Sequence, residues 1–326
     1  MRILITGSAG HLGEALVRTL RSDHEVIGLD LVGSPFTTVV GTITDRATVE
    51  RCMDGVEAVL HTATLHKPHV ATHMRQQFID TNLTGTLNLL EAAIEARVRS
   101  FIVTSTTSTF GRALTPAPGD PAAWITEEVM PMPKNIYGMT KAAAEDLCEL
   151  FHVNQGLACL ILRTSRFFPE ADDSAEIRQT YTDGNAKVNE YLYRRVDIQD
   201  VVAAQIRAIA RAPALGFGRY IISATTPFSV DDLAELRTDA PRVVKRRFPE
   251  YQEEYARRGW QMFPSIDRVY VNEKARRDLG WNPRYHFGYI LEQLRLGQTF
   301  RSPLSLAVGA KGYHTDKFTD FPYPVE

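Results

Sequence analysis

The sequence predicts a doubly wound α/β fold, in which a parallel sheet carries helices on both faces. Two observations lead to this prediction. Short apolar runs rich in β-forming residues alternate with amphipathic stretches from residue 1 to about residue 165, as in sheets built from strand–helix–strand units. A loop with three spaced glycines also lies between the first apolar run and the first amphipathic stretch, where such folds bind phosphate groups.

The expected elements of this first part follow in chain order. The apolar runs, each short enough for a strand, are RILIT (2–6), EVIGLD (25–30), AVLHT (58–62), FIVTS (101–105) and ACLILR (158–163). The stretches expected to be helices, from their amphipathic pattern, are HLGEALVRTL (11–20), GTLNLLEAAIEA (85–96) and KAAAEDLCELF (141–151). We therefore assign residues 1–165 to one domain.

Residues 166–326 are expected to form mostly a smaller, partly discontinuous substrate-binding cap. The sequence is polar and irregular up to about residue 190. A helix, IQDVVAAQIRAIAR, and a strand, RYIIS, follow, so a segment of about 195–225 is expected to return to the first domain. YQEEYARRGW (251–260) is interpreted as a solvated helix face with ion pairs at i,i+4 spacing, Glu253 with Arg257 and Glu254 with Arg258. The tail FTDFPYPVE (318–326) is rich in Pro and aromatic residues, and is either docked or loose.

The bulk composition gives no sign of a nucleic-acid or membrane partner, and the protein is expected to be cytoplasmic. The 326 residues are 44% hydrophobic and 23% charged, with a formal net charge of -2, which gives no electrostatic reason for a nucleic-acid or membrane partner. No run reaches the ~18–20 apolar residues that span a bilayer, and MRILITG lacks a signal-peptide core. The three cysteines are too few and too scattered for a disulfide framework, and Cys159 is expected to be a buried, inert thiol.

The glycine loop ITGSAGHLG predicts a dinucleotide site. Gly7, Gly10 and Gly13 allow a tight turn, a close approach of the backbone to a pyrophosphate, and close packing of helix on strand. The following helix N-terminus offers N–H donors to the phosphates. His11 and Leu12 lie inside the loop and belong to the expected cofactor contacts.

Asp30 closes the second expected strand, twenty residues beyond Gly10. A carboxylate there accepts hydrogen bonds from the adenosine ribose and repels a 2′-phosphate, and Leu31 and Val32 bring no arginine to offset that repulsion. NAD is therefore favoured over NADP as the cofactor. The alternative interpretation of Asp30 is an acid that stabilises the turn at the strand end.

Tyr137 and Lys141 are four residues apart, and on a helix that starts at Asn135 they lie on one face. A phenol has an ordinary pKa near ~10. A lysine ammonium and a helix N-terminus both stabilise phenolate, so we expect the pKa of Tyr137 to be drawn toward the working range. TSTTSTFG (104–111) follows a strand at the carboxyl edge of the sheet, and is either a source of an oxyanion donor or a polar turn.

Taken together, the chain resembles the extended short-chain dehydrogenase/reductase family, and within it the NAD-dependent epimerase/dehydratase group typified by UDP-glucose 4-epimerase. The resemblance covers almost the whole chain through TGSAGHLG, VLHTAT, NLTGTLNLLEAA, VTSTTSTFG, YGMTKAAAE, RRVDIQDVVAA and ARRDLGW. It implies a Rossmann-type domain that binds NAD. It also implies a homodimer through the helices at about 82–97 and 137–152.

The resemblance assigns roles to single residues. It implies Tyr137 as acid/base, Lys141 as its partner and ribose ligand, and Thr106 as the hydroxyl that binds the reacting oxygen. The remaining implied cofactor contacts are Thr62, Ala63 and Thr64 after a strand, Asn82 as a tie to the neighbouring helix, and Thr42 with Ile43 around the adenine, where the family commonly has Asp at the position of Thr42.

Three departures concern the substrate. Thr107 and Ser108 follow Thr106 where the dehydratases carry Asp-Glu, so dehydration is disfavoured, and Thr107 becomes a candidate substrate contact. Arg166 stands where nucleotide-sugar epimerases tend to hold an asparagine; it either binds a carboxylate or phosphate, or pairs with Glu170, Asp172 or Asp173. His66, His69 and His73 lack a carboxylate or cysteine to complete a metal site, so no metal is expected, and His66 is either a substrate contact or part of a polar loop.

The predicted function is an NAD-dependent epimerase acting on a sugar or nucleotide sugar. In this chemistry a secondary alcohol is transiently oxidised and then reduced again from its other face. Release of the keto product instead would make the protein a dehydrogenase or reductase, because both outcomes need the same Thr106, Tyr137 and Lys141. A non-catalytic NAD-binding sensor or scaffold is the alternative from another class.

Overall fold

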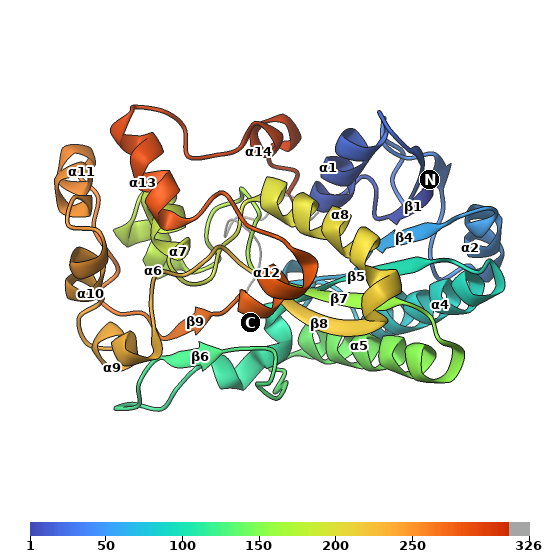
Figure 1. Cartoon of the computed structure of the whole chain (residues 1–326), viewed down its shortest axis with the longest axis horizontal. Helices are drawn as coiled ribbons and strands as arrows, with labels where there is room; N and C mark the ends of the chain where they lie inside the picture. The colour runs from blue at the N-terminus through green and yellow to red at the C-terminus, as the bar shows by residue number, and fades with distance from the viewer. Residues whose placement is uncertain (313–326) are drawn as a thin grey trace.

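The computed structural model describes residues 1–312, and the sequence-based interpretation of the tail FTDFPYPVE falls outside these described residues. The chain forms one large and one small sheet with helices around them (Figure 1). The large sheet has seven parallel strands in the order β3-β2-β1-β4-β5-β7-β8. This order, which runs outward in both directions from β1, confirms the predicted doubly wound α/β fold.

The strands lie where the apolar runs predicted them, with shifts of one or two residues at their ends. The large sheet consists of β1 (Arg2–Thr6), β2 (Glu25–Asp30), β3 (Val39–Val40), β4 (Ala58–His61), β5 (Ser100–Thr106), β7 (Cys159–Thr164) and β8 (Phe217–Ile222). Central strands are covered on both faces and therefore read as continuous apolar runs. The two-residue edge strand β3 is too short to give such a signal and was not predicted.

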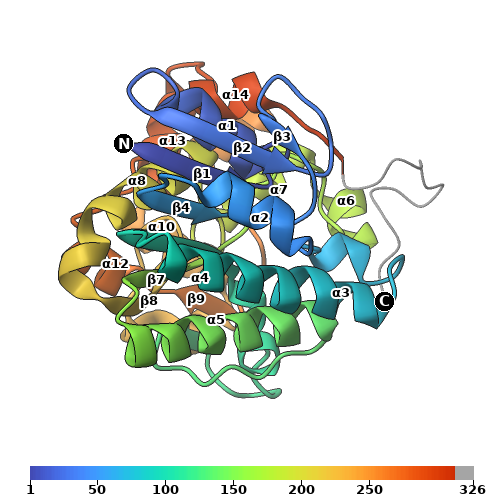
Figure 2. The ribbon, with the colours of Figure 1, turned by 90° about the vertical axis from the view of Figure 1, so that its right-hand side faces the viewer.

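Helices cover both faces of the large sheet. One face carries α1 (His11–Leu20), α8 (Ile198–Leu215), α12 (Glu273–Leu279) and α14 (Pro303–Val308), whose core includes Leu16, Val201 and Trp281. The other carries α2 (Arg46–Met53), α4 (Gly85–Glu95) and α5 (Ile136–Gln155), and Figure 2 shows α4 and α5 side by side there. The turn before α4 consists of α3 (Arg75–Ile79) and a π-helical segment, η2 (Asp80–Thr84).

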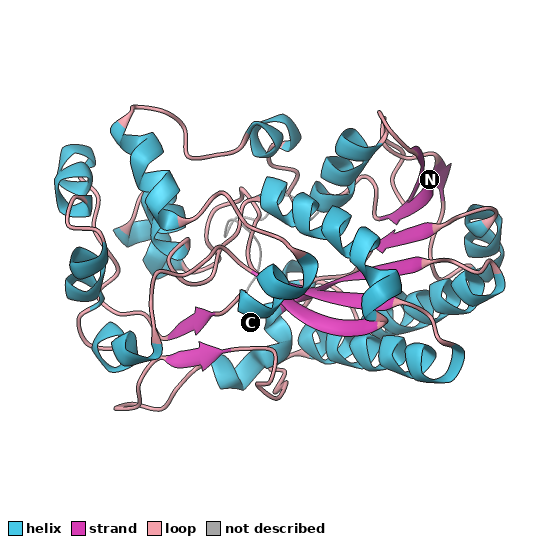
Figure 3. Ribbon diagram, viewed as in Figure 1, coloured by secondary structure: helices cyan, strands magenta, loops and turns pink. Residues whose placement is uncertain are grey.

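The small sheet lies beside the large one and pairs β6 (Ala123–Ile125) with β9 (Arg268–Tyr270) in parallel (Figure 3). The helices around it are α6 (Ala175–Thr180), α7 (Asp183–Glu190), α9 (Leu233–Leu236), α10 (Ala240–Arg247), α11 (Tyr251–Arg258) and α13 (Phe287–Arg295). Short 3-10 turns are η1 (Lys67–His69), η3 (Thr107–Leu114) and η4 (Val230–Asp232). An aromatic core that includes Tyr251, Phe263 and Phe287 holds this second part together.

The helix α11 corrects one prediction. Glu253 is exposed as expected, but Glu254 is buried, with 1% of its side chain exposed. Glu254 pairs with Arg258, whose guanidinium also donates to the carbonyl of Leu294 in α13. The helix is therefore attached to its neighbour by one face and is not solvated all round.

Cys52, Cys148 and Cys159 are buried free thiols, as expected for Cys159. Within residues 1–312, none of the helices has the length and apolar character needed to cross a bilayer.

Candidate active site

A cavity of about 730 Å³ opens at the carboxyl ends of the central strands. It collects most of the residues singled out in the sequence: Gly7, Gly10, His11, Leu12, Gly13, Asp30, Thr42, Ile43, Thr62, Ala63, Thr64, His66, Thr106, Thr107, Tyr137 and Arg166. Asn82 and Lys141 are buried behind this lining. Residues separated by up to about half the chain thus meet at the edge of the sheet where parallel-sheet proteins bind ligands.

The glycine loop has no room for side chains. Gly7 has a φ of +73°, and a Cβ on it would lie 2.8 Å from the backbone nitrogen of Ala63. A Cβ on Gly13 would lie 1.9 Å from the carbonyl oxygen of Gly7. The first turn of α1 therefore packs directly against the end of β1, and at Gly7 and Gly13 only backbone lines the cavity.

Asp30 stabilises the same loop from the end of β2. Its Oδ2 accepts from the backbone N–H of Ala9 at 2.9 Å and its Oδ1 from that of Val32 at 2.9 Å. The carboxylate also lines the cavity. Its role in the turn thus leaves it in position to face a ligand, because each carboxylate oxygen can accept more than one hydrogen bond.

The end of β4 is fixed by a buried polar chain. Thr6 Oγ1 accepts from the backbone N–H groups of Thr62 and Ala63, each at 3.2 Å. It also contacts His61 Nδ1 at 2.8 Å, and His61 Nε2 contacts Thr86 Oγ1 at 3.0 Å. Burial, assisted by the nearby charge of Lys141, lowers the pKa of His61 to about 3, so the ring is neutral at physiological pH.

Asn82 connects this loop to α5. Its Oδ1 accepts from Thr64 Oγ1 at 2.8 Å and from the backbone N–H of Leu65 at 2.9 Å. Its Nδ2 donates to the Leu65 carbonyl and to Thr140 Oγ1, each at 3.0 Å. Thr140 precedes Lys141, so Asn82 holds the helix that carries the Tyr-Lys pair against the loop after β4.

Tyr137 lies in the first turn of α5. The Asn135 side chain accepts from the N–H of Gly138 at 3.1 Å, which confirms Asn135 as the N-cap. Thr106, at the end of β5, lies close enough to the Tyr137 side chain to lower its pKa, and its Oγ1 accepts from the N–H of Ser108 at 3.1 Å. The two side chains predicted to act on one oxygen therefore lie near each other in one cavity.

The expected pKa of Tyr137 is wrong in direction. Burial raises the pKa of the Tyr137 phenol to about 12, and the Thr106 side chain only partly opposes this. Burial also lowers the pKa of Lys141 to about 8, although the charge of Glu145 opposes it. Loss of solvation outweighs the effect of the Thr106 side chain at Tyr137 and the attraction to Glu145 at Lys141.

Below Lys141, a buried ion pair fixes α5 to the sheet. Glu145 is paired with Arg163 of β7 at 2.7 Å, and both side chains are at most 3% exposed. Arg219 of β8 and the hydroxyl of Ser105 also contact Glu145. Tyr137 and Thr106 are therefore carried by elements that are joined by direct hydrogen bonds.

Arg166 both lines the cavity and pairs with carboxylates. It contacts Asp172, Asp173 at 3.2 Å and Glu190 at 3.4 Å. The predicted pairing with Glu170 is not formed. Glu170 instead contacts His11 Nε2 at 2.8 Å and accepts from the backbone N–H of Lys311 at 3.0 Å.

The three histidines after β4 lie together. His66 N–H donates to His69 Nδ1 at 3.0 Å, and the rings of His69 and His73 lie 4.9 Å apart. Over residues 1–312, no group of three or more metal-ligating side chains has a suitable arrangement. The His66 ring lies 5.6 Å from that of Phe168 on the cavity wall.

Comparison with known proteins then identifies the family. The model of the NAD-dependent epimerase/dehydratase family matches residues 3–214. The chain belongs to this family. It is 26% identical to a 3-beta-hydroxysteroid dehydrogenase of Mycolicibacterium neoaurum, with 87% of each chain covered, and 26% identical to a UDP-glucose 4-epimerase of Rhizobium meliloti, with 89% and 94% covered.

Among solved structures, a short-chain dehydrogenase/reductase superfamily protein from Agrobacterium tumefaciens with bound NAD shares the fold with a TM-score of 0.65, at 24% identity and coverage of 91% and 96%. As a member of the epimerase/dehydratase family, the chain is an NAD-dependent enzyme of the extended short-chain dehydrogenase/reductase type. The residues present fit NAD, because a Cβ would fill the glycine cradle and Asp30 faces the same cavity.

Several cavity residues of this family member were missed in the sequence. Arg194, Arg268 and Tyr270 come from the second half, and Lys311 and Gly312 from the far end of the described chain. The YRR triplet at 193–195 was a visible signal for Arg194. Arg268 and Lys311 stand in no local motif, so only the tertiary fold brings them to the site.

Proposed function

We propose that the protein is an NAD-dependent epimerase that inverts a secondary alcohol of a sugar or nucleotide sugar by transient oxidation. The observation that carries this proposal is that Thr106 and Tyr137 line the same cavity as the glycine cradle, with Lys141 buried behind them. NAD, when bound, accepts a hydride from the alcohol carbon and returns it to the keto intermediate. Gly7, Gly10, Gly13 and Asp30 would hold it, together with Thr62, Ala63 and Lys141.

The chain's own residues then handle the proton. Tyr137 takes the proton of the substrate hydroxyl during oxidation and returns it to the keto oxygen during reduction. Because burial raises its pKa to about 12, the phenol is protonated at neutral pH, so it has to release its own proton to solvent before the phenolate can accept that of the substrate hydroxyl. Thr106 donates to the same oxygen. Lys141, charged below about pH 8, favours the phenolate.

The same site supports a second candidate, an NAD-dependent dehydrogenase or reductase of a sugar or other small hydroxy or keto compound. Similar proteins carry both kinds of name, the Rhizobium meliloti epimerase and the Mycolicibacterium neoaurum dehydrogenase. A sensor or scaffold without turnover is disfavoured, because the chain belongs to an enzyme family and keeps Thr106, Tyr137 and Lys141 together.

Tyr137→Phe tests the chemistry. We expect turnover to fall by about 10²–10⁴-fold, because the proton acceptor is removed, while the dissociation constant for NAD changes little. Tyr289→Phe, on α13 and away from the cavity, is the matched control. Steady-state kinetics and calorimetric titration with NAD measure both quantities. Full activity in the Tyr137 variant would contradict the proposed mechanism.

Retained cofactor separates the two candidates. An epimerase returns the hydride in each cycle, so denaturing the purified protein is expected to release close to one NAD per chain. Little released NAD, together with net formation of NADH during turnover, would favour the dehydrogenase.

We also propose a cytoplasmic homodimer. Exposed apolar side chains along α5, namely Met139, Leu150 and Val153, support contact through this helix. Analytical ultracentrifugation of wild type and Val153→Glu tests the contact: the charge is expected to yield monomers.

A further inference from the structure

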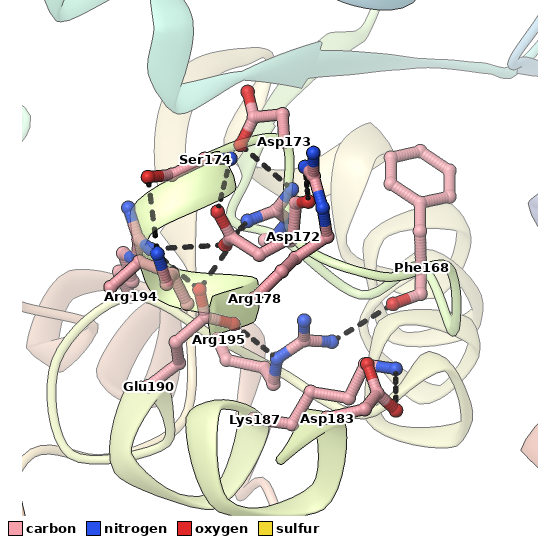
Figure 4. A network of polar contacts seen from close by, with 12 residues as sticks. Phe168, Asp172, Asp173, Ser174, Arg178, Asp183, Lys187, Glu190, Arg194 and Arg195 are labelled. Carbon is pink, nitrogen blue, oxygen red and sulfur yellow. Dashed lines mark hydrogen bonds and ion pairs between the residues drawn. The ribbon is translucent and has the colours of Figure 1, made fainter. Parts of the chain in front are cut away.

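A cluster of arginines lines the wall of the cavity that the second half of the chain provides. Arg166 follows β7, Arg194 follows α7, and Arg268 begins β9. The backbone N–H of Tyr270 donates to the carbonyl of Tyr193 at 3.0 Å, which joins β9 to the segment that carries Arg194. Figure 4 shows Arg194 among Asp172, Glu190 and Arg195. Arg194 lies close enough to repel both Arg166 and Arg268.

These guanidinium groups are largely buried and incompletely paired. The side chains of Arg166, Arg194 and Arg268 are 21%, 22% and 15% exposed. The Nε atoms of Arg194 and Arg268 are buried and have no hydrogen-bond partner in the described part of the chain. An unpaired buried donor costs free energy unless something accepts from it, so this wall lacks an acceptor.

The network also carries excess positive charge. The ion pairs join four cations to three carboxylates: the cations are Lys67, Arg166, Arg194 and Arg195, and the carboxylates are Asp173, Asp172 and Glu190. Four cations against three carboxylates leave one positive charge unbalanced. Arg268 pairs with Asp267, a carboxylate that is 36% exposed. The excess depends on Lys67, whose side chain is 51% exposed, and a bound anion would compensate it.

The cavity ends at this wall. Between residues 195 and 310 its lining consists of Arg268 and Tyr270 alone. The space beyond them is filled by the aromatic core, where Tyr193 and Phe263 are buried against each other. Within residues 1–312, the lining of this cavity therefore gives a substrate that reaches from Tyr137 to the arginines no space beyond them for a nucleoside.

We propose that Arg166, Arg194 and Arg268 bind the carboxylate or phosphate of a monosaccharide-sized substrate whose secondary alcohol lies at Thr106 and Tyr137. Arginine forks bind both kinds of oxyanion with paired, charge-assisted hydrogen bonds. This inference rests on the proposed function and narrows its substrate class: the substrate is a compact anionic sugar derivative, and no nucleotide handle is bound.

Calorimetric titration in the presence of NAD tests the substrate class. The ligands are D-glucuronate, D-glucose 6-phosphate, D-galactose and UDP-glucose, and the proteins are wild type and Tyr137→Phe. We expect the carboxylate or the phosphate ligand to bind at least about tenfold more tightly than the neutral sugar and UDP-glucose, in both proteins; the better of the two identifies the oxyanion. Equal or tighter binding of galactose or UDP-glucose, or no binding of either anion, overturns the proposal.

Arginine variants test the assigned residues. Arg268→Gln and Arg194→Gln are expected to weaken binding of the preferred anion by about 10–100-fold, through loss of hydrogen bonds to a charged group. Arg242→Gln, on the outer face of α10, is the matched control and retains the wild-type affinity. Unchanged NAD affinity shows that each variant is folded, and Arg268→Lys supplies a second variant that keeps the charge but loses the fork. Wild-type affinity for the anion in folded Arg268→Gln and Arg194→Gln overturns the assignment.

The two proposals fail in different ways. Full turnover in Tyr137→Phe would contradict the proposed function. Weak binding of the anions would contradict this inference, and that measurement does not require turnover. Binding of an anion through the arginines would therefore support the arginine site even if the protein had no activity.

Discussion

At the scale of single residues, Tyr137 and Lys141 show what local spacing can and cannot predict. The i,i+4 spacing and the Asn135 cap were readable because they depend on local geometry alone. The pKa values were not, because loss of solvation depends on the segments that cover the two side chains: Asn82, the loop after β4, and the buried pair of Glu145 and Arg163. A phenol with a pKa of about 12 and an ammonium with a pKa of about 8 are each displaced toward their neutral forms.

The lowered pKa of Lys141 predicts the effect of Lys141→Met on stability. Burial favours the neutral amine, so a buried charged lysine costs folding free energy below pH 8, and we expect the variant to be about 1–3 kcal/mol more stable at pH 7. Between pH 8 and pH 10.5 the unfolded chain binds more protons than the folded one, so the wild type gains stability and the difference shrinks. Denaturant unfolding at several pH values measures it.

Turnover of Lys141→Met is expected to fall by at least about 10²-fold, because the phenolate loses its supporting charge. A variant that is less stable than the wild type at pH 7 would show instead that attraction to Glu145 outweighs the burial of the charge.

At the scale of elements, burial on both faces decided which strands could be predicted. β1, β4, β5 and β7 are central, and their continuous apolar runs are visible in the sequence. The strands β6 and β9 of the small sheet have three residues each, which is too short for a pattern to develop. The π-helical turn that places Asn82 was not predicted either, because it depends on contacts with α5 rather than on local propensity.

Gly138 sets how closely α5 approaches the end of β5. A Cβ on Gly138 would lie 2.8 Å from the carbonyl oxygen of Ser108, so Gly138→Ala has to push the helix away from the loop that follows Thr106. We expect kcat to fall by about 10–100-fold, since a displacement of about 1 Å costs this much in positioned catalysis. The variant is expected to retain its helix, because alanine favours helix over glycine.

Gly184→Ala is the matched control, since its Cβ would meet Trp260 at 3.4 Å, an ordinary contact. Wild-type kcat is expected there. Equal activity of both variants would mean that the distance between α5 and β5 does not limit turnover.

At the scale of the whole molecule, the cavity wall depends on segments that no local pattern connects. The glycine loop, Asp30 and the Tyr-Lys pair were predictable because each belongs to a short motif. Arg268 and Lys311 were not, since β9 and the end of the described chain reach the cavity only through tertiary contacts. The segment of about 195–225 was predicted to return to the first domain from its own apolar pattern. It contains α8 and β8, and β8 is a strand of the large sheet.

This return predicts that residues 1–165 do not fold alone. Every residue of β7 from Cys159 to Thr164 pairs with β8, and Gln205 of α8 donates to Thr104 of β5 at 2.8 Å. Without α8, one face of the sheet loses its cover and exposes apolar side chains such as Ile102 and Leu162. A fragment of residues 1–165 is therefore expected to unfold without cooperativity and to bind hydrophobic dyes, as followed by near-UV circular dichroism and dye fluorescence.

A fragment of residues 1–222 restores β8 and α8 and is expected to recover cooperative unfolding. It still lacks Trp281, which packs on the same face and donates to the carbonyl of Asp200 at 2.9 Å. Its free energy of unfolding should therefore lie below that of the full chain. Removing a large buried aromatic side chain costs about 3–5 kcal/mol, which gives the scale of the difference. Cooperative unfolding and NAD binding by residues 1–165 would instead mean that the sheet is stable with one face open, and that the late segments serve the substrate alone.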